Sequence, residues 1–260
     1  MGTATLSVEK QGLLAMMRLA RPEAGNPIDR RFLQDLEDAC AAINDDADVR
    51  AVLLAAEGEV FSIGWGPEEL SPDHFDAAEW RRRWETAPPF ACLEAMAQPV
   101  VCAINGDAVS AGLELALACD VRIAAQGARL ALPETALGLL PMAGGTQRLA
   151  RLVGRGEALR LMLLADSIDA EEARRIGLVS AVVPPERLLA DAEAVAQRIA
   201  SRGPVAVRYA KEAVRRGLEL PLDQALRYET DLTVILQTTD DRQEGVRAFL
   251  EKRQPEFKGR

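Results

Sequence analysis

Two acidic side chains stand in stretches of the sequence that are otherwise apolar. Glu114 is the only charged residue between Asp107 and Asp120, and most of its neighbours are Ala, Val and Leu. Glu134 follows Pro133 in the similarly apolar stretch LPETALGLL. Burying a carboxylate among aliphatic groups is costly unless it is paired, hydrogen-bonded or protonated. Two such carboxyl groups beside one substrate can serve as an acid–base pair.

Glycine-rich turns near these glutamates can supply backbone hydrogen-bond donors. FSIGWG, residues 61–66, alternates glycine with bulky residues, so its backbone can turn tightly and approach a ligand. NGDAVSAGLELALACD predicts a strand, a turn and a helix that begins near Ser110–Gly112, where free N–H groups and the helix dipole favour negative charge. Taken singly, each feature is also typical of ordinary structure, such as a simple turn or a carboxylate satisfied by backbone donors. Together they predict two N–H donors to one oxygen atom, with two carboxyl groups beside it as an acid–base pair.

The chain closely resembles the crotonase (enoyl-CoA hydratase/isomerase) superfamily over nearly its whole length. The matching strings, in order, are RPEAGNPID, FSIGWG, INGDAVSAGLELALACDVRIAA, PETALGLLPMAGGTQRL, AEEARRIGLVSAVVP and EGVRAFLEKR. Their order and spacing are far more specific than any one motif. The resemblance implies an α/β fold, a crotonase-type spiral of repeated ββα units with a C-terminal all-helical trimerisation region. It also implies a homotrimer or a dimer of trimers.

The same resemblance implies a coenzyme A thioester substrate and assigns roles to residues. The backbone N–H groups of Trp65 and Ala111 would form an oxyanion hole for the thioester oxygen. Glu114 would activate a water and Glu134 would deliver a proton to C2, so that water adds reversibly to a 2-enoyl-CoA without a metal or a separate cofactor. The two carboxyl groups would titrate as a unit. The matching positions expected to bind substrate are Ala24, Ile63, Gly64, Gly66, Gly112, Pro133 and Lys252.

Four positions depart from the pattern that the family commonly shows. Gly66 stands where many members carry Asp, and Ile63 replaces a frequent Ala. Trp65 is large, and its indole can narrow or reshape the acyl pocket; a Trp here is also found in members of the carnitinyl-CoA dehydratase type. Glu23 lies where some members have a basic residue near the coenzyme A phosphates.

Other functions stay open from the sequence. A different crotonase reaction, such as isomerisation, carnitinyl-CoA dehydration, retro-aldol cleavage or thioester hydrolysis, is compatible with this fold, although two glutamates favour hydration. A non-catalytic acyl-CoA-binding protein has no reason to bear a second buried carboxylate. RNA binding, known in one branch of the family, is disfavoured by the net charge of −9 and the absence of a lysine-rich helix.

Short apolar runs alternate with helical patterns in residues 1–185, which predicts an α/β core that carries the active site, with mostly parallel strands. The expected strands are Leu13–Leu19, Val49–Ala55, Val100–Ile104, Val121–Ala124 and Leu178–Val183, and the helices are Arg31–Ile43, Glu157–Ala165 and Ala170–Ile176.

Residues 186–260 predict a helical region for oligomerisation and for covering the site. Its expected helices are Glu186–Ser201, Pro204–Gly217, Leu222–Gln237 and Asp240–Arg253. The proline-rich stretch Gly66–Phe90 predicts a mobile, partly helical cover.

The composition fits a globular protein of a reducing compartment. Of the 260 residues, 48% are hydrophobic, which is enough for a sizeable core. The acidic balance disfavours nucleic-acid and anionic-membrane partners, and no apolar run approaches the length of a membrane span. The four cysteines lack metal-ligand spacing, and the single histidine is His74, so we expect a cytoplasmic protein without a metal site. The basic clusters at 148–160 and 202–216 predict solvated helix faces, or contacts of a few side chains with ligand phosphates.

Overall fold

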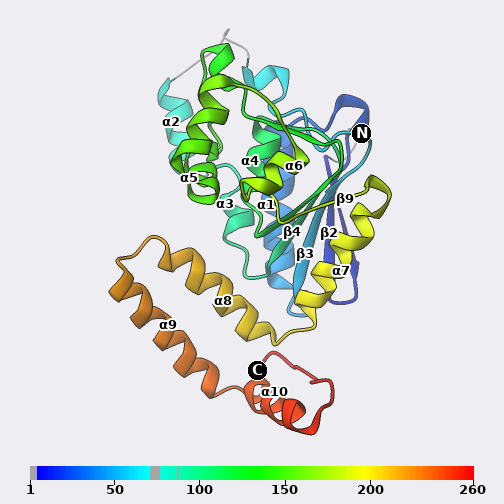
Figure 1. The fold of residues 1–260 in the computed structure, drawn as a ribbon, viewed down its shortest axis with the longest axis vertical. Coiled ribbons are helices and arrows are strands. Elements are labelled where there is room, and N and C mark those ends of the chain that lie inside the picture. Colours follow the sequence, from blue (N-terminus) through cyan, green and yellow to red (C-terminus); the bar gives the residue numbers. More distant parts are fainter. Residues whose placement is uncertain (1–4, 71–76, 87) are drawn as a thin grey trace.

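The computed structural model describes residues 5–70, 77–86 and 88–260. They form a six-stranded sheet, a small three-stranded sheet, and helices that pack on the sheets or extend from them (Figure 1). The strands of the large sheet, in spatial order, are β1 Leu6–Gln11, β2 Leu14–Leu19, β3 Ala51–Ala56, β4 Val100–Ile104, β6 Val121–Ala125 and β9 Ala181–Val183. Those of the small sheet are β5 Ala108–Val109, β7 Arg129–Ala131 and β8 Ile168–Asp169.

Two consecutive parts of the chain repeat the same strand–strand–helix pattern. In the first, β4 joins the large sheet, β5 joins the small sheet, and helix α4 (Ala111–Leu117) follows. In the second, β6, β7 and helix α5 (Gly145–Leu164) occur in the same order. From β2 to β9 the neighbouring strands of the large sheet are parallel, as are β5 and β7. This arrangement confirms the predicted α/β spiral of ββα units.

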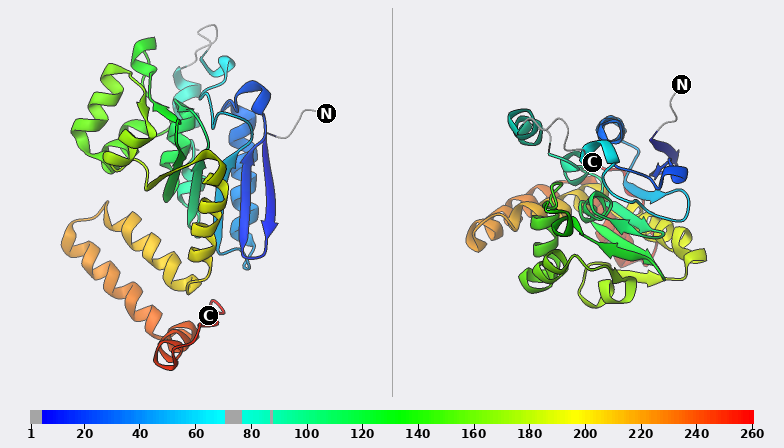
Figure 2. Two further views of the ribbon diagram at one scale, coloured as in Figure 1. Left: turned by 45° about the vertical axis from the view of Figure 1, so that its right-hand side comes forward. Right: turned by 90° about the horizontal axis from the view of Figure 1, so that it is seen from above.

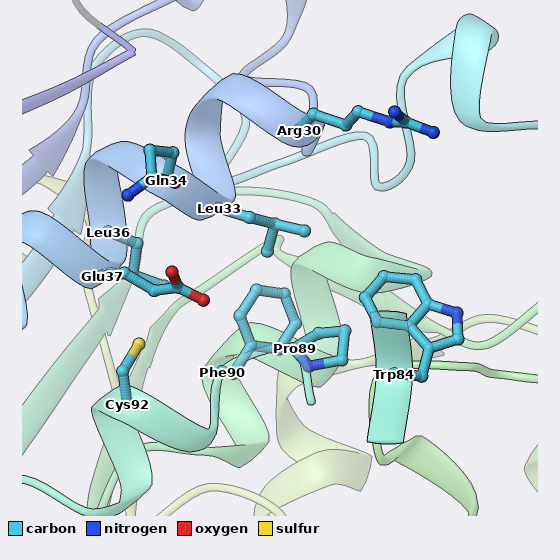
Figure 3. A pocket seen from close by; sticks show the side chains of 9 residues that line it. All are labelled: Arg30, Leu33, Gln34, Leu36, Glu37, Trp84, Pro89, Phe90 and Cys92. Carbon is cyan, nitrogen blue, oxygen red and sulfur yellow. The ribbon is translucent and has the colours of Figure 1, made fainter. Parts of the chain in front are cut away.

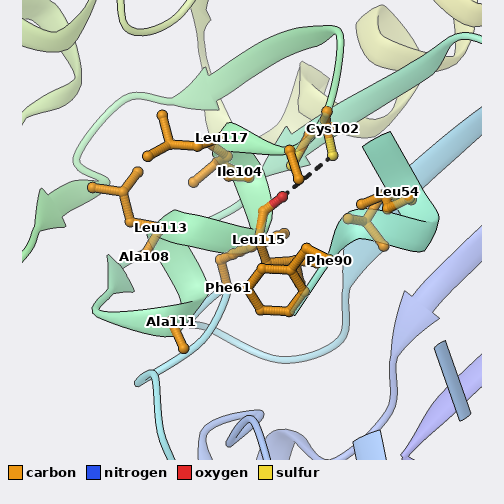
Figure 4. Packing of buried hydrophobic residues seen from close by; sticks show 14 of the residues in the cluster. Leu54, Phe61, Phe90, Cys102, Ile104, Ala108, Ala111, Leu113, Leu115 and Leu117 are labelled. Carbon is orange, nitrogen blue, oxygen red and sulfur yellow. Dashed lines mark hydrogen bonds between the residues drawn. The ribbon is translucent and has the colours of Figure 1, made fainter. Parts of the chain in front are cut away.

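Helix α4 is buried on every side. Leu113 and Leu115 are each at most 1% exposed, and Figure 4 shows them among buried side chains that include Phe61 and Phe90. A helix that is apolar all round is stable only inside a core. Its single carboxylate, Glu114, is therefore held by a rigid element rather than by a surface loop.

Five further elements complete the core around the sheets. The helices are α1 Arg30–Asp45, α2 Ala77–Thr86, α3 Ala91–Glu94, α6 Ala170–Arg175 and α7 Leu188–Ala200. Short 3-10 turns lie at Pro22–Ala24, Pro67–Leu70, Glu134–Leu137 and Pro185–Arg187. Helix α7 buries Leu188, Ala192, Ala196 and Ala200 against the large sheet. By packing, α7 belongs to the α/β core, although the predicted division after residue 185 places it with the helical region.

The last three helices leave the core. They are α8 Pro204–Gly217, α9 Leu222–Gln237 and α10 Asp240–Glu251, and Figure 2 shows them extending away from both sheets. The bounds of α8 and α9 are those predicted from their apolar stripes. The chain after α10 folds back, since the Asp241 carboxylate accepts hydrogen bonds from the backbone N–H groups of Lys258 and Gly259 at 2.6 and 2.8 Å.

Several elements differ from the sequence-based prediction. Strand β1 is not predicted because it is an edge strand that pairs only with β2, and its sequence LSVEKQ is polar and largely exposed. The three strands of the small sheet have only two or three residues each, too few to show a period. The strand predicted at Leu178–Val183 is shorter, and the helix predicted at Glu157–Ala165 is the second half of α5, after a kink at Gly154 with φ of 80°.

Part of the predicted cover, Gly66–Phe90, lies outside the described residues, as does His74. The described remainder consists of Gly66, the turn Pro67–Leu70, helix α2 and residues 88–90, which lie directly before α3. Within the described ranges, no helix is both long enough and apolar enough to cross a membrane. The same ranges contain no group of three or more His, Cys, Asp or Glu side chains arranged to hold a metal ion.

Candidate active site

Three chain segments run parallel to one another, and each is followed by a turn that carries predicted site residues. Strand β5 lies between β7 and Ser62, which forms a parallel bridge with Ala108. The N–H of Val109 donates to the carbonyl oxygen of Ser62 at 3.0 Å, and the N–H of Ser110 donates to that of Ala131 at 2.9 Å. Because the carboxyl ends of parallel strands lie at the same edge, the turns that follow these segments converge.

Two glycines allow the turn after Ser62 and the start of α4 to touch. Gly64 has φ of 96°, and a Cβ atom there would lie 2.5 Å from Cβ of Ser110. A Cβ atom on Gly112 would lie 2.6 Å from Cβ of Ser62. Ser110 itself has φ of 55°, a strained value for a residue with a side chain, and it is the residue that turns the chain from β5 into α4. Only glycine fits at positions 64 and 112 without moving one turn away from the other.

The backbone N–H groups of Trp65 and Ala111 lie in these two turns. Trp65 is flanked by bonds that fix the turn: Ile28 N–H donates to Gly64 O, and Gly66 N–H donates to Ile28 O, both at 2.7 Å. Ala111 is the first residue of α4. Among the residues that the structure describes, neither N–H has a backbone or side-chain acceptor. Two donors on adjacent rigid turns are therefore free to bind a ligand oxygen.

Glu114 is fully buried, and one of its two carboxylate oxygens is held by backbone donors. Oε1 accepts hydrogen bonds from the N–H groups of Ala143 at 2.8 Å and of Gly145 at 2.7 Å, at the N-terminus of α5. Oε2 is buried and has no hydrogen-bond partner in the described part of the chain. The fixed oxygen sets the orientation of the carboxyl group and leaves the other oxygen free for a water or a substrate.

Glu134 is 2% exposed and opens the 3-10 turn that follows β7. Neither of its carboxylate oxygens meets hydrogen-bond geometry with any of the described residues. The side chain of Ser110 is near enough to oppose the effect of burial on its pKa. Since Ser110 caps the helix that carries Glu114, the two glutamates come from neighbouring turns.

Burial raises the pKa of both carboxyl groups. For Glu114, burial has the largest effect, and the negative charge of Glu134 raises the pKa further. The N–H donors of Gly145 and Ala143 and the charge of Arg148 lower it. The resulting pKa of Glu114 is about 7. Burial is also the main cause of the raised pKa of Glu134. The Ser110 side chain and the backbone of Glu134 oppose this rise in the pKa of Glu134, because hydrogen-bond donors favour the ionised form of a carboxyl group. Both carboxyl groups are therefore easier to protonate than an ordinary glutamate, and because they act on each other they titrate as a unit.

The raised pKa of Glu114 predicts a specific pH dependence of stability. Its ordinary value of 4.5 applies to the unfolded chain, so between pH 4.5 and 7 the folded protein binds more protons and its stability falls as the pH rises. Relative to Glu114→Gln, the wild type should lose about 3 kcal/mol of unfolding free energy across that window. Urea unfolding of both proteins at several pH values measures the difference. A difference that does not change with pH would contradict the raised pKa.

Gly145 leaves room for the Glu114 carboxylate, which makes Gly145→Ala a test of its position. The added Cβ atom would lie 2.8 Å from Oε1 of Glu114 and 2.9 Å from Cβ of Pro141. We expect kcat to fall by about 10²-fold, the size of effect that a displacement of about 1 Å can produce, with little change in KM. Gly156→Ala is the matched control, since it lies in the same helix with nothing within 4 Å. Equal activities of the two variants would show that the carboxylate does not need this position.

The other predicted binding residues lie in three places. Ala24 and Ile63 lie together at the edge of the site, because Ile63 N–H donates to the carbonyl oxygen of Gly25 at 2.9 Å and both side chains are exposed. Pro133 and Gly66 adjoin Glu134 and Trp65 in the chain. Lys252 follows α10 directly and has an exposed side chain, and Figure 1 shows α10 away from the sheets.

The indole of Trp65 lies next to a separate cavity. Its indole is 4% exposed, and its ring centroid lies 6.0 Å from that of Trp84 on α2. Trp84 lines a cavity of about 240 Å³ between α1 and the α2–α3 region, shown in Figure 3. The other lining residues are Arg30, Leu33, Gln34, Leu36, Glu37, Pro89, Phe90 and Cys92. Neither glutamate lines this cavity. The contact between Trp84, which lines it, and Trp65 joins the cavity to the turn that carries the free N–H group of Trp65.

Most basic side chains of the two clusters noted in the sequence form ion pairs. Lys211 pairs with Asp120 at 2.8 Å, and Arg160 pairs with Glu172 at 2.6 Å. Arg151 and Arg216 also contact glutamates. The ion pairs give these side chains a structural role, so contacts with ligand phosphates are not needed to explain them.

The donors that hold Glu114 are not among the residues predicted from the sequence. Ala143 and Gly145 lie in the string MAGGTQRL, whose two adjacent glycines are the available signal for a tight turn before a helix. Trp84 is also not predicted, because nothing in the sequence places α2 against Trp65. Both contacts join residues at least 19 positions apart in the chain.

The fold and the site define an enzyme-like centre with two buried carboxyl groups and two free N–H donors at one edge of a spiral α/β core. The sequence profile of the Enoyl-CoA hydratase/isomerase family matches residues 9–260, and the chain belongs to this family. The predicted crotonase resemblance is therefore confirmed.

Known relatives match along the whole chain. A crotonyl-CoA hydratase of Syntrophomonas wolfei is 40% identical over 258 residues, covering 99% of both chains. A short-chain-enoyl-CoA hydratase of Clostridium acetobutylicum is 38% identical, covering 97% of both. The crystal structure of an enoyl-CoA hydratase from Bacillus anthracis superposes with a TM-score of 0.93 at 39% identity, covering 98% of this chain and 100% of that one.

Proposed function

We propose that this chain is an enoyl-CoA hydratase, which adds water reversibly across the C2–C3 double bond of a 2-enoyl-CoA thioester. One observation carries the proposal. Two buried carboxyl groups, Glu114 and Glu134, have oxygens without a hydrogen-bond partner in the described residues, and their turns converge with those that carry the free N–H groups of Trp65 and Ala111. The family relationship and the full-length hydratase relatives support it.

The free N–H groups of Trp65 and Ala111 would form the oxyanion hole. Attack of water on C3 moves electrons through C2 and develops enolate charge on the thioester oxygen. Two fixed donors stabilise that charge without reorganising, and the N-terminal end of α4 adds its dipole. Gly64 and Gly112 keep the two donors close, so they contribute through backbone spacing.

The two glutamates would divide the proton transfers. The free Oε2 of an ionised Glu114 accepts a proton from the attacking water while the oxygen bonds to C3. A protonated Glu134 gives its proton to C2, which completes the 3-hydroxyacyl-CoA. Glu114 gains a proton as Glu134 loses one, so a proton must pass between the pair, or through solvent, before the next turnover. The reaction needs acid, base and oxyanion stabilisation only, and we propose no cofactor besides the coenzyme A of the substrate.

The substrate test is the turnover of a panel of 2-enoyl-CoA thioesters, followed by the loss of the conjugated thioester absorbance. Crotonyl-CoA is the first choice, because the relatives named above include a crotonyl-CoA hydratase and a short-chain hydratase. Longer, branched and polar acyl chains then show how Trp65 and Ile63 shape the acyl site. Binding of acyl-CoA without any turnover of the panel would favour a binding protein instead.

We further propose a homotrimer or a dimer of trimers that assembles through α8–α10 and brings Lys252 to a neighbouring site. These helices expose large apolar side chains that their own chain does not cover, including Leu222 at 74% and Phe249 at 81%. Sedimentation velocity should therefore give three or six times the chain mass of 28.1 kDa. The four free cysteines fit a reducing compartment, which favours the cytoplasm.

A further inference from the structure

The turn whose N–H groups bind Glu114 contacts an arginine that has no role in the proposed reaction. Arg148 lies one turn into α5, and its side chain is only 16% exposed. Its Nη1 donates to the carbonyl oxygen of Ala143 at 2.6 Å. Ala143 is thus fixed at both polar groups, because its N–H donates to Oε1 of Glu114 at 2.8 Å.

The fit between Arg148 and this turn is close. Gly144 has φ of 99°, and a Cβ atom there would lie 2.1 Å from Nη1 of Arg148. The guanidinium therefore packs directly on the backbone between the two N–H donors of Glu114, those of Ala143 and Gly145. A shift of the guanidinium would shift both donors.

Arg148 has its own anchor on another element. Its Nη2 and Nε both donate to Oε2 of Glu94, the last residue of α3, at 2.7 and 3.2 Å. A planar guanidinium can bind a carboxylate and a carbonyl oxygen at the same time, whereas an ammonium lacks this rigid fork of donors. The chain of contacts runs from Glu94 through Arg148 and Ala143 to Glu114.

We propose that Arg148, anchored by Glu94, is a positioning residue that fixes the Ala143–Gly145 turn and thereby the orientation and charge of the Glu114 carboxylate. Arg148 does not touch the substrate in this role. The charged groups that act on Glu114 are Glu134 from the turn after β7 and Arg148 from α5, with Glu94 of α3 behind Arg148. The consequence for turnover rests on the proposed hydratase activity.

The test compares Arg148→Met, Arg148→Lys and Arg151→Met in kcat, KM and the pH profile of kcat/KM with crotonyl-CoA. Arg151 is the matched control, since it lies on the same helix, is exposed and pairs with Glu219. In Arg148→Met we expect kcat to fall by about 10²-fold at nearly constant KM, the size expected for a displaced carboxylate. The acidic limb of kcat/KM should move to higher pH, because a cation that favours ionised Glu114 is gone. Arg148→Lys keeps the charge, so its acidic limb should stay near the wild-type position while kcat falls.

A readout that needs no turnover separates this proposal from the proposed function. The infrared carboxyl band of protonated Glu114, assigned with Glu114→Gln, can be titrated in each variant without substrate. A rise in the titration midpoint of Arg148→Met but not of Arg151→Met supports the proposal, even if crotonyl-CoA is not hydrated. Equal kcat values and equal midpoints in these two variants overturn it. If Arg148→Met does not fold, Arg148→Lys decides, and wild-type kcat in that variant overturns the proposal.

Discussion

Replacing either buried glutamate with glutamine should abolish most hydratase activity without disturbing the fold. We expect Glu114→Gln and Glu134→Gln each to lower kcat by about 10²- to 10⁴-fold, the usual contribution of a positioned acid or base. In Glu114→Gln the amide oxygen can still accept the hydrogen bonds from Ala143 and Gly145, so the side chain keeps its place but cannot take a proton. Steady-state kinetics with crotonyl-CoA measures the loss.

The control for these variants is Glu171→Gln, on the surface of α6. It removes one carboxylate from the protein and should leave kcat and KM unchanged. Thermal melting of all three variants shows whether a loss of activity follows from unfolding. Wild-type turnover in both Glu114→Gln and Glu134→Gln would refute the acid–base assignment even if the protein hydrates crotonyl-CoA.

A methyl group on Gly64 should disable the proposed oxyanion hole. In Gly64→Ala the new Cβ atom would meet Cβ of Ser110 at 2.5 Å and the carbonyl oxygen of Val109 at 2.7 Å. Since backbone atoms cannot swing away as a side chain can, the Trp65 turn must move away from Ala111. We expect kcat to fall by about 10²- to 10³-fold, as when one oxyanion donor is lost. The oxyanion hole acts mainly in the transition state, so KM should change little.

Gly127→Ala separates this effect from the general cost of a left-handed backbone. Gly127 has φ of 88°, close to the 96° of Gly64, but nothing lies within 4 Å of its added Cβ atom. Both variants should lose about 1–2 kcal/mol of stability from the backbone conformation, and only Gly64→Ala should lose turnover. Equal kcat values in the two variants would show that the spacing of the two turns does not limit the reaction.

The sequence predicts the parts of the fold whose apolar pattern is continuous. Helices α8 and α9 have the predicted bounds because each carries an unbroken stripe of apolar residues at helical spacing. The central strands are predicted because strands buried on both faces are apolar throughout. Strand β1 escapes prediction because an edge strand needs few apolar residues, and β5, β7 and β8 are too short to show any period.

By itself, the sequence determines which residues are exceptional. A lone carboxylate in an apolar stretch signals an unusual environment whatever the fold, so Glu114 and Glu134 can be identified from their neighbours in the chain, as can the glycines that permit close approach. What only the tertiary structure decides is how these residues meet. The pairing of Ser62 with β5 and of β5 with β7 brings three turns to one edge, and the contact of Arg148 with Ala143 and Glu94 orients one of the carboxylates. The strand pairings join residues far apart in the chain through backbone groups that every residue carries, and such groups leave no mark in the sequence. The Arg148–Glu94 contact joins side chains 54 positions apart, a distance over which the sequence shows no pattern.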